Sequence, residues 1–155
     1  MPIVLSNNTV GAPDLTGEDG SLYGLFKWAL PQLGWSLEFD DPANFRAAFR
    51  NSALTGSGFF VRITDKAGLH TGNADGALVE VFQAMNDIDA GSGAAFSVER
   101  FLPKSASVDG TPRAWHLVGD DRLFHWLPER FNRRYWCPIG NGNPLFENDI
   151  SAFIC

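Results

Sequence analysis

The first periodic pattern in the chain predicts one amphipathic helix close to its N-terminal end. Between residues 21 and 33, six apolar side chains recur at the spacing of a single helix face, namely Leu22, Leu25, Phe26, Ala29, Leu30 and Leu33. We expect Asp19 or Ser21 to cap the start of this helix. Pro31 and Gly34 should end it, because proline lacks a backbone donor and glycine suits a C-terminal turn.

After this helix the period of apolar residues changes to two, which is typical of strands with one buried face. Alternating or β-rich runs predict strands over residues 35–39, 45–50, 59–64, 77–85, 97–102, 114–118 and 122–127. The turn Gly119-Asp120-Asp121 marks the strongest predicted hairpin. Residues 128–155 contain too many prolines and glycines for a long regular element.

These elements predict an α+β domain that is mainly antiparallel β. We expect a sandwich or barrel-like sheet of six or seven short strands, with one N-terminal amphipathic helix packed on it. Residues 1–17 are polar and contain several turn formers, so they are interpreted as an extended N-terminal arm. Residues 18–155 then form a single domain, and the apolar stretch Ile3-Val4-Leu5 is the part that can anchor the arm.

Charge and composition exclude several classes of protein. The 155 residues carry 18 acidic and 12 basic side chains, a net charge of −6, so nucleic acid is not expected as a direct partner. A hydrophobic content of 45% excludes a disordered chain. No apolar run reaches the roughly 18 residues of a membrane span, and no membrane partner is expected.

The aromatic side chains are numerous for so few charges, with thirteen Phe, five Trp and two Tyr. About half of them fall on the predicted buried stripes, and we assign the rest to contacts between subunits. One patch mixes cations and aromatics, namely Arg130, Phe131, Arg133, Arg134, Tyr135 and Trp136. Such a patch can bind single-stranded nucleic acid, sugar or protein, and the acidic net charge favours protein.

No complete catalytic, cofactor or metal site is visible in the sequence. The three histidines lie at no metal-motif spacing, so structural roles are expected for His70, His116 and His125. Residues 86–93 resemble a calcium loop but lack its late bidentate acid, and turns closed by Asp side chains explain the run. Cys137 and Cys155 give no disulfide framework. A dispersed carboxylate pair stays open as an alternative.

Several short segments, in a fixed order, carry a resemblance to known proteins. The two most specific are Met-x-Asp-Ile-Asp-x-Gly-x-Gly at 85–93 and Arg-x-Trp-x-Leu-Val-Gly-Asp-x-Arg-x-Phe at 113–124. Further segments lie at 11–17, 20–22, 34–35, 49–52, 61–63, 103–105 and 145–151. Together they resemble a family of virion structural proteins of tailed bacteriophages and prophages.

This resemblance implies a non-enzymatic component of the virion, in the head, neck or tail. Its expected partners are other virion proteins, and it is expected to form a homo-oligomer assembled in the host cytoplasm. The resembling proteins continue past residues 146–151, so we hypothesise that this chain is truncated at its C-terminal end. The expected interface residues are Ile3, Val4, Leu5 and Leu15 of the arm, together with the patch at 130–136.

Two other functions remain open. One is a carbohydrate- or receptor-binding module of the particle, in which exposed Trp28, Trp126 or Trp136 would stack on a sugar ring. The other is a small hydrolase that uses two carboxylates brought together by the fold.

Overall fold

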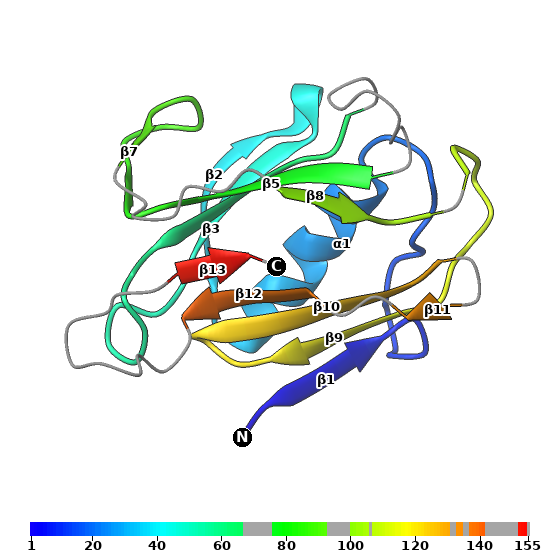
Figure 1. Ribbon diagram of the computed structural model, residues 1–155, viewed down its shortest axis with the longest axis horizontal. Helices are drawn as coiled ribbons and strands as arrows, with labels where there is room; N and C mark the ends of the chain where they lie inside the picture. Colours follow the sequence, from blue (N-terminus) through cyan, green and yellow to red (C-terminus); the bar gives the residue numbers. More distant parts are fainter. Residues whose placement is uncertain are drawn as a thin grey trace.

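The computed structural model describes residues 1–66, 76–92, 100–105, 107–130, 133–134, 137–141 and 152–154. Short strands dominate this part of the chain, and it contains a single α-helix (Figure 1). In chain order the elements are β1 (Ile3–Ser6), α1 (Ser21–Ala29), the 3-10 turn η1 (Leu30–Leu33), β2 (Ser36–Asp41), the 3-10 turn η2 (Pro42–Asn44), β3 (Arg46–Arg50), β4 (Phe60–Thr64), β5 (Gly76–Phe82), β6 (Ala84–Met85), β7 (Gly91–Ser92), β8 (Arg100–Pro103), β9 (Trp115–Gly119), β10 (Leu123–Arg130), β11 (Arg133–Arg134), β12 (Cys137–Asn141) and β13 (Ala152–Ile154).

The described strands form three sheets, and every pairing between them is antiparallel. A six-stranded sheet has the order β1-β9-β10-β12-β13, with β11 paired to β10. A five-stranded sheet has the order β2-β3-β4-β5-β8, and β6 pairs with β7. The prediction of a mainly antiparallel β domain with one short helix is therefore confirmed. The finer prediction of one sandwich or barrel-like sheet led by an N-terminal helix is wrong, since there are three sheets and β1 precedes the helix.

The two large sheets pack against a common core, with α1 contacting both. Inward positions of the five-stranded sheet alternate with outward ones and are apolar, for example Val61 and Ile63 on β4. From the helix, Leu22, Leu25, Phe26 and Ala29 are fully buried in the same core. The predicted helical stripe is confirmed, although the helix ends at Ala29 and η1 continues it to Gly34, whose φ of +91° suits glycine.

Aromatic side chains fill the space between the helix and the sheets. Phe26 of α1 meets Phe124 and Trp126 of β10 edge-to-face, with both pairs of ring centroids 5.6 Å apart. Trp35 meets Phe124 at 5.2 Å and Phe59 at 5.5 Å. Each buried indole N–H also finds an acceptor, since Trp126 Nε1, for example, donates to the Pro103 carbonyl at 3.1 Å. None of the described aromatic side chains is exposed, so within this part of the chain the assignment of surplus aromatics to contacts is wrong.

A buried ion pair fixes the start of α1. Asp65, which follows β4, accepts hydrogen bonds at Oδ2 from the backbone N–H groups of Leu22 and Tyr23, at 2.6 and 3.1 Å. Its Oδ1 accepts from Lys104 Nζ at 2.5 Å, and Lys104 also donates to the Glu18 carbonyl. Burial raises the pKa of the Asp65 carboxyl, while the Lys104 ammonium opposes that shift. The prediction that Asp19 or Ser21 caps the helix is therefore wrong, because a residue distant in sequence does so.

The outer face of the five-stranded sheet is covered in part by the segment 84–92. Met85 and Ile88 of this segment pack on Phe60 and Ala48. Arg62 donates to the Ile88 carbonyl at 2.5 Å and pairs with Glu80 at 2.7 Å. This covering layer explains why the outward positions of β3 and β4 mix arginines with aromatic and aliphatic side chains.

We predict that the buried ion pair is needed for stability. Lys104→Met should lower the free energy of unfolding by about 3–5 kcal/mol, because it leaves the Asp65 carboxylate buried without a cation. The double variant Asp65→Asn, Lys104→Met should lose less than the sum of the two single variants. Urea denaturation measures all three free energies.

The matched control is Lys27→Met, since the Lys27–Asp40 pair has the same chemistry at 2.6 Å but its side chains are 30% and 29% exposed. It should cost about 1 kcal/mol or less. An equal loss for Lys104→Met and Lys27→Met would contradict the role given to the buried pair.

Candidate functional site

The predicted N-terminal arm lies on the body of the protein as an edge strand. β1 pairs with β9, with Ile3 opposite Gly119 and Ser6 opposite His116. Leu5 is 4% exposed and Leu15 is fully buried, so both belong to this chain's own core. The prediction that these two leucines contact a neighbour is thereby corrected, because no surface of their side chains is left for another subunit.

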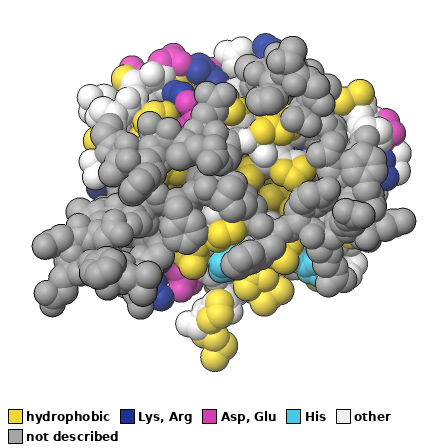
Figure 2. Space-filling model, in the orientation of Figure 1, with side chains coloured by type: hydrophobic (Ala, Val, Ile, Leu, Met, Phe, Trp, Pro, Cys, Tyr) yellow, Lys and Arg dark blue, Asp and Glu magenta, His cyan; other side chains and the backbone are white. Residues whose placement is uncertain are grey.

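The other two residues predicted for an arm interface lie on the surface. Val4 is 63% exposed and Ile3 is 40% exposed. Met1 and Val10 are exposed as well, so four of the seven large apolar side chains exposed in the described part lie within the first ten residues. Figure 2 shows hydrophobic side chains protruding at the lower margin, where Figure 1 places β1 and the N-terminus. We call Met1, Ile3, Val4 and Val10 the N-terminal surface.

On the outward edge of β1, only one residue has backbone hydrogen-bonding groups that no other described residue binds. The Asn7 N–H bonds the Trp115 carbonyl on β9, whereas the Ser6 N–H bonds Thr9 Oγ1 and the Ser6 carbonyl accepts from the Thr9 N–H. Alternate residues of a strand direct their backbone groups to the same side. Val4 therefore directs its N–H and C=O away from β9, and the turn at Ser6–Thr9 closes the next outward position.

The predicted patch at 130–136 falls largely outside the described residues. Phe131, Tyr135 and Trp136 lie outside them. The backbones of Arg130, Arg133 and Arg134 lie where β10 pairs with β11, with Arg130 opposite Arg133. This patch stays a sequence-based prediction.

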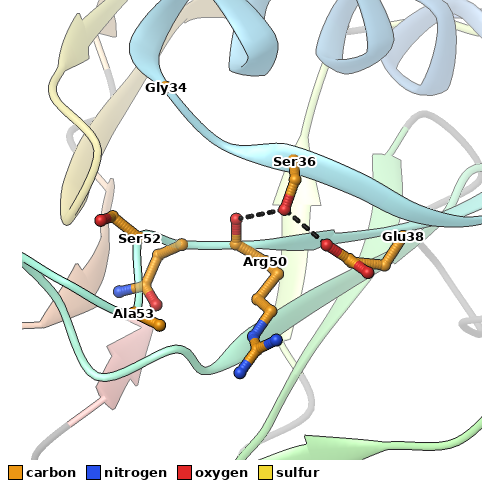
Figure 3. A pocket seen from close by; sticks show the side chains of 7 residues that line it. Gly34, Ser36, Glu38, Arg50, Ser52 and Ala53 are labelled. Carbon is orange, nitrogen blue, oxygen red and sulfur yellow. Dashed lines mark hydrogen bonds between the residues drawn. The ribbon is translucent and has the colours of Figure 1, made fainter.

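A second candidate site is a polar pocket at the edge of the five-stranded sheet. Its volume is about 210 Å³, and it is lined by Gly34, Ser36, Glu38, Arg50, Asn51, Ser52 and Ala53. Figure 3 shows Ser36 and Glu38 on β2 and Arg50 on the neighbouring β3, with the loop that carries Ser52 and Ala53 below them. The lining therefore combines one cation, one anion and two hydroxyl groups, with no aliphatic side chain longer than alanine.

The Arg50 guanidinium is held in place but has no ionic partner among the residues that the structure describes. Its Nε donates to the Gly58 carbonyl at 3.0 Å, and its Cζ lies 5.3 Å from the centre of the Phe60 ring. The other four arginines whose side chains are described all pair with a carboxylate, namely Arg46, Arg62, Arg113 and Arg122. Arg50 is thus oriented by neutral groups, and its charge is left available to the pocket.

Glu38 is positioned by an irregularity in β2. Leu37 pairs with Phe49 and Phe39 with Ala48, so Glu38 is the extra residue of a bulge. Bulges redirect side chains and recur beside functional sites. Ser36 Oγ donates to Glu38 Oε1 at 2.6 Å, and no described cation lies within ion-pair distance of this carboxylate.

The predicted structural roles of polar residues are partly visible. Asp87 Oδ1 accepts from the backbone N–H groups of Asp89 and Ala90 at 2.7 and 2.8 Å, which is the turn expected in place of a calcium loop. Register places His116 opposite Leu127 and His125 opposite Val118, so the two histidines are not direct cross-strand partners. His70 lies outside the described residues, and the described ones contain no group of three or more metal-ligating side chains.

The positions of the described tryptophan and carboxylate side chains bear on the two alternative functions. Trp126 is fully buried, so it cannot serve as the exposed sugar platform that was predicted. Trp28 is half-buried and packs edge-to-face on Trp115 at 6.2 Å, and Trp136 lies outside the described residues. The polar pocket contains one carboxylate, Glu38, and a groove of about 430 Å³ over β3, β4 and β5 also contains one, Glu80. Neither places two acids together.

Sequence reasoning did not find the polar pocket. Glu38 and Arg50 each occupy a polar position in an alternating strand, and such positions are usually solvated surface. The bulge that redirects Glu38, and the lack of an ion pair between Arg50 and any described carboxylate, become visible only once the strands are paired.

We predict that Gly58 maintains the position of Arg50. Its φ is +71°, and an added Cβ would lie 3.1 Å from Arg50 Nη2 and 3.4 Å from the Ala53 side chain. Gly58→Ala should therefore lower the free energy of unfolding by about 1 kcal/mol and shift the NMR signal of the Arg50 Nε–H. Gly24→Ala, where an added Cβ meets nothing within 4 Å, is the control and should do neither. An unchanged Arg50 signal in Gly58→Ala would contradict this role.

Among the described residues no helix is long and apolar enough to cross a membrane. With respect to relatives, no protein-family model, no curated protein and no solved structure matches this chain. Any role must therefore come from the chemistry and placement of the residues described above.

Proposed function

We propose that the protein is a non-enzymatic structural component of a tailed-phage virion, acting in the head, neck or tail through contacts with neighbouring virion proteins. The proposal starts from the ordered sequence segments that resemble this family. The observation that carries it is the N-terminal surface, which gathers exposed apolar side chains on the edge strand β1 and the residues that flank it. Subunits of a symmetric assembly bury such surfaces against each other.

The contact we propose is with a second copy of this chain, strand β1 against strand β1. Two copies related by a two-fold axis at Val4 would exchange two hydrogen bonds, each from a Val4 N–H to the partner's Val4 carbonyl. The neighbouring outward position is already closed by the turn at Ser6–Thr9, so only this register is free. The two exposed Val4 side chains would then pack side by side on one face of a continuous sheet.

Charge is compatible with this pairing. β1 contains no charged side chain, unlike β2 at one edge of the five-stranded sheet, which carries Glu38, Asp40 and Asp41 and a bulge. Charges and bulges on an edge strand discourage pairing with another chain, and β1 has neither. The net charge of −6 repels two copies at long range, so association should become stronger as salt screens that repulsion.

We predict that a cysteine at position 4 links two copies. Directly opposite residues of a hydrogen-bonded antiparallel pair have Cα atoms about 5.5 Å apart, a distance that a disulfide can span. Under mild oxidation, Val4→Cys should give a covalent dimer, more rapidly at higher salt. Leu54→Cys is the matched control, because Leu54 is 97% exposed in a loop away from β1, and it should give no more dimer than the unmodified chain. Equal dimer yields from the two variants would contradict the β1 contact.

Incorporation into particles tests the wider proposal. Val4→Lys should fold with an unchanged urea midpoint, since Val4 faces solvent, but should be depleted from purified virions of a phage that encodes this protein. Leu54→Lys should be incorporated normally. Absence of the unmodified protein from such virions would contradict the virion role, whereas normal incorporation of Val4→Lys would contradict only the β1 contact.

A further inference from the structure

We propose that the polar pocket binds the zwitterionic group of an α-amino acid, with Arg50 holding the carboxylate and Glu38 holding the ammonium. This inference is independent of assembly through β1, because it concerns the five-stranded sheet and a small ligand. It rests on the two opposite charges that line one small pocket without pairing with each other or with any described residue.

The two charges of the pocket are not neutralised by each other. The pocket brings together a guanidinium and a carboxylate, yet no ion pair of 4.0 Å or less joins Glu38 to Arg50 or either residue to another described group. A ligand with both charges complements both walls at once. A phosphate or another dianion would be repelled by Glu38, and a simple cation would be repelled by Arg50.

Geometry supports the same ligand. The Nε bond to Gly58 and the Phe60 ring fix the guanidinium plane, and its Nη groups have no hydrogen-bond partner among the described residues, so they can bind a carboxylate in the usual two-point manner. Glu38 Oε1 is held by Ser36, while Oε2 bonds none of the described residues. Binding would therefore require little ordering of either side chain, which lowers its entropic cost.

Size sets the class of ligand. Drug-sized ligands occupy pockets of roughly 300–1,000 Å³, and this pocket is smaller, at about 210 Å³. Its lining offers the hydroxyl groups of Ser36 and Ser52 but no apolar wall for a large side chain. We therefore expect small amino acids, such as alanine, to bind better than aromatic ones.

The experiment is a titration of the full ¹⁵N-labelled chain with L-alanine, followed by two-dimensional NMR. Saturable shifts of the Ser36, Glu38 and Arg50 signals, with a dissociation constant of about 1 mM, are expected. N-acetyl-L-alanine lacks the ammonium and L-alaninamide lacks the carboxylate, and each should bind at least about tenfold more weakly, the effect of roughly 1.4 kcal/mol.

Two variants assign the two charges. Glu38→Gln should weaken binding of L-alanine about tenfold and abolish its advantage over N-acetyl-L-alanine, while its advantage over L-alaninamide remains. Arg50→Gln should show the reverse pattern. Asp14→Asn and Lys66→Gln change the same charges at exposed positions outside the pocket and should bind L-alanine normally. Absence of saturable shifts, shifts that map elsewhere, or equal binding of alanine and both blocked derivatives would overturn the proposal.

Discussion

The buried pair of Asp65 and Lys104 determines how the helix meets the sheets. Asp65 follows β4 and binds the first free N–H groups of α1, while Lys104 follows β8 and also binds the Glu18 carbonyl in the segment before the helix. A charge removed from water is tolerated only when partners surround it. Any other placement of α1 would leave a carboxylate or an ammonium without those partners. The aromatic core, which depends on Phe26 reaching β10, is therefore built on a polar constraint.

Local patterns were sufficient for much of the fold. The helical stripe from Leu22 to Leu33 and the alternating runs of β3, β4 and β9 have the period of their elements, because one face of each is buried in the common core. β1 was missed because four residues are too few to show a period. β12 and β13 lie among the prolines and glycines of the last part of the chain. The helix cap could not be read locally, since Asp65 lies 43 residues from Leu22.

The candidate sites also differ in how far the sequence could predict them. Ile3, Val4, Leu5 and Leu15 were all plausible contact residues, since apolar side chains in a polar segment must be covered by something. Pairing with β9 decides between them, because it turns Leu5 inward and Val4 outward. For the polar pocket no such signal existed, since a cation on β3 and an anion on a bulge of β2 become neighbours only through strand register. The charges that line the polar pocket are therefore brought together by the pairing of strands and not by a local sequence pattern.

The pairing of β1 with β9 also has a consequence for biosynthesis. The ribosome makes residues 3–6 well before their partners at 116–119, which emerge more than a hundred residues later. During that interval both edges of β1 are unpaired and its apolar side chains have no sheet to join. Contacts so distant in sequence form slowly, and unpaired strands of this kind favour premature association. Once β9 is complete and pairs with β1, only the outward edge of β1 stays free. A chain still being translated can therefore bind other strands through both edges of β1, whereas a finished chain can do so only through the outward edge.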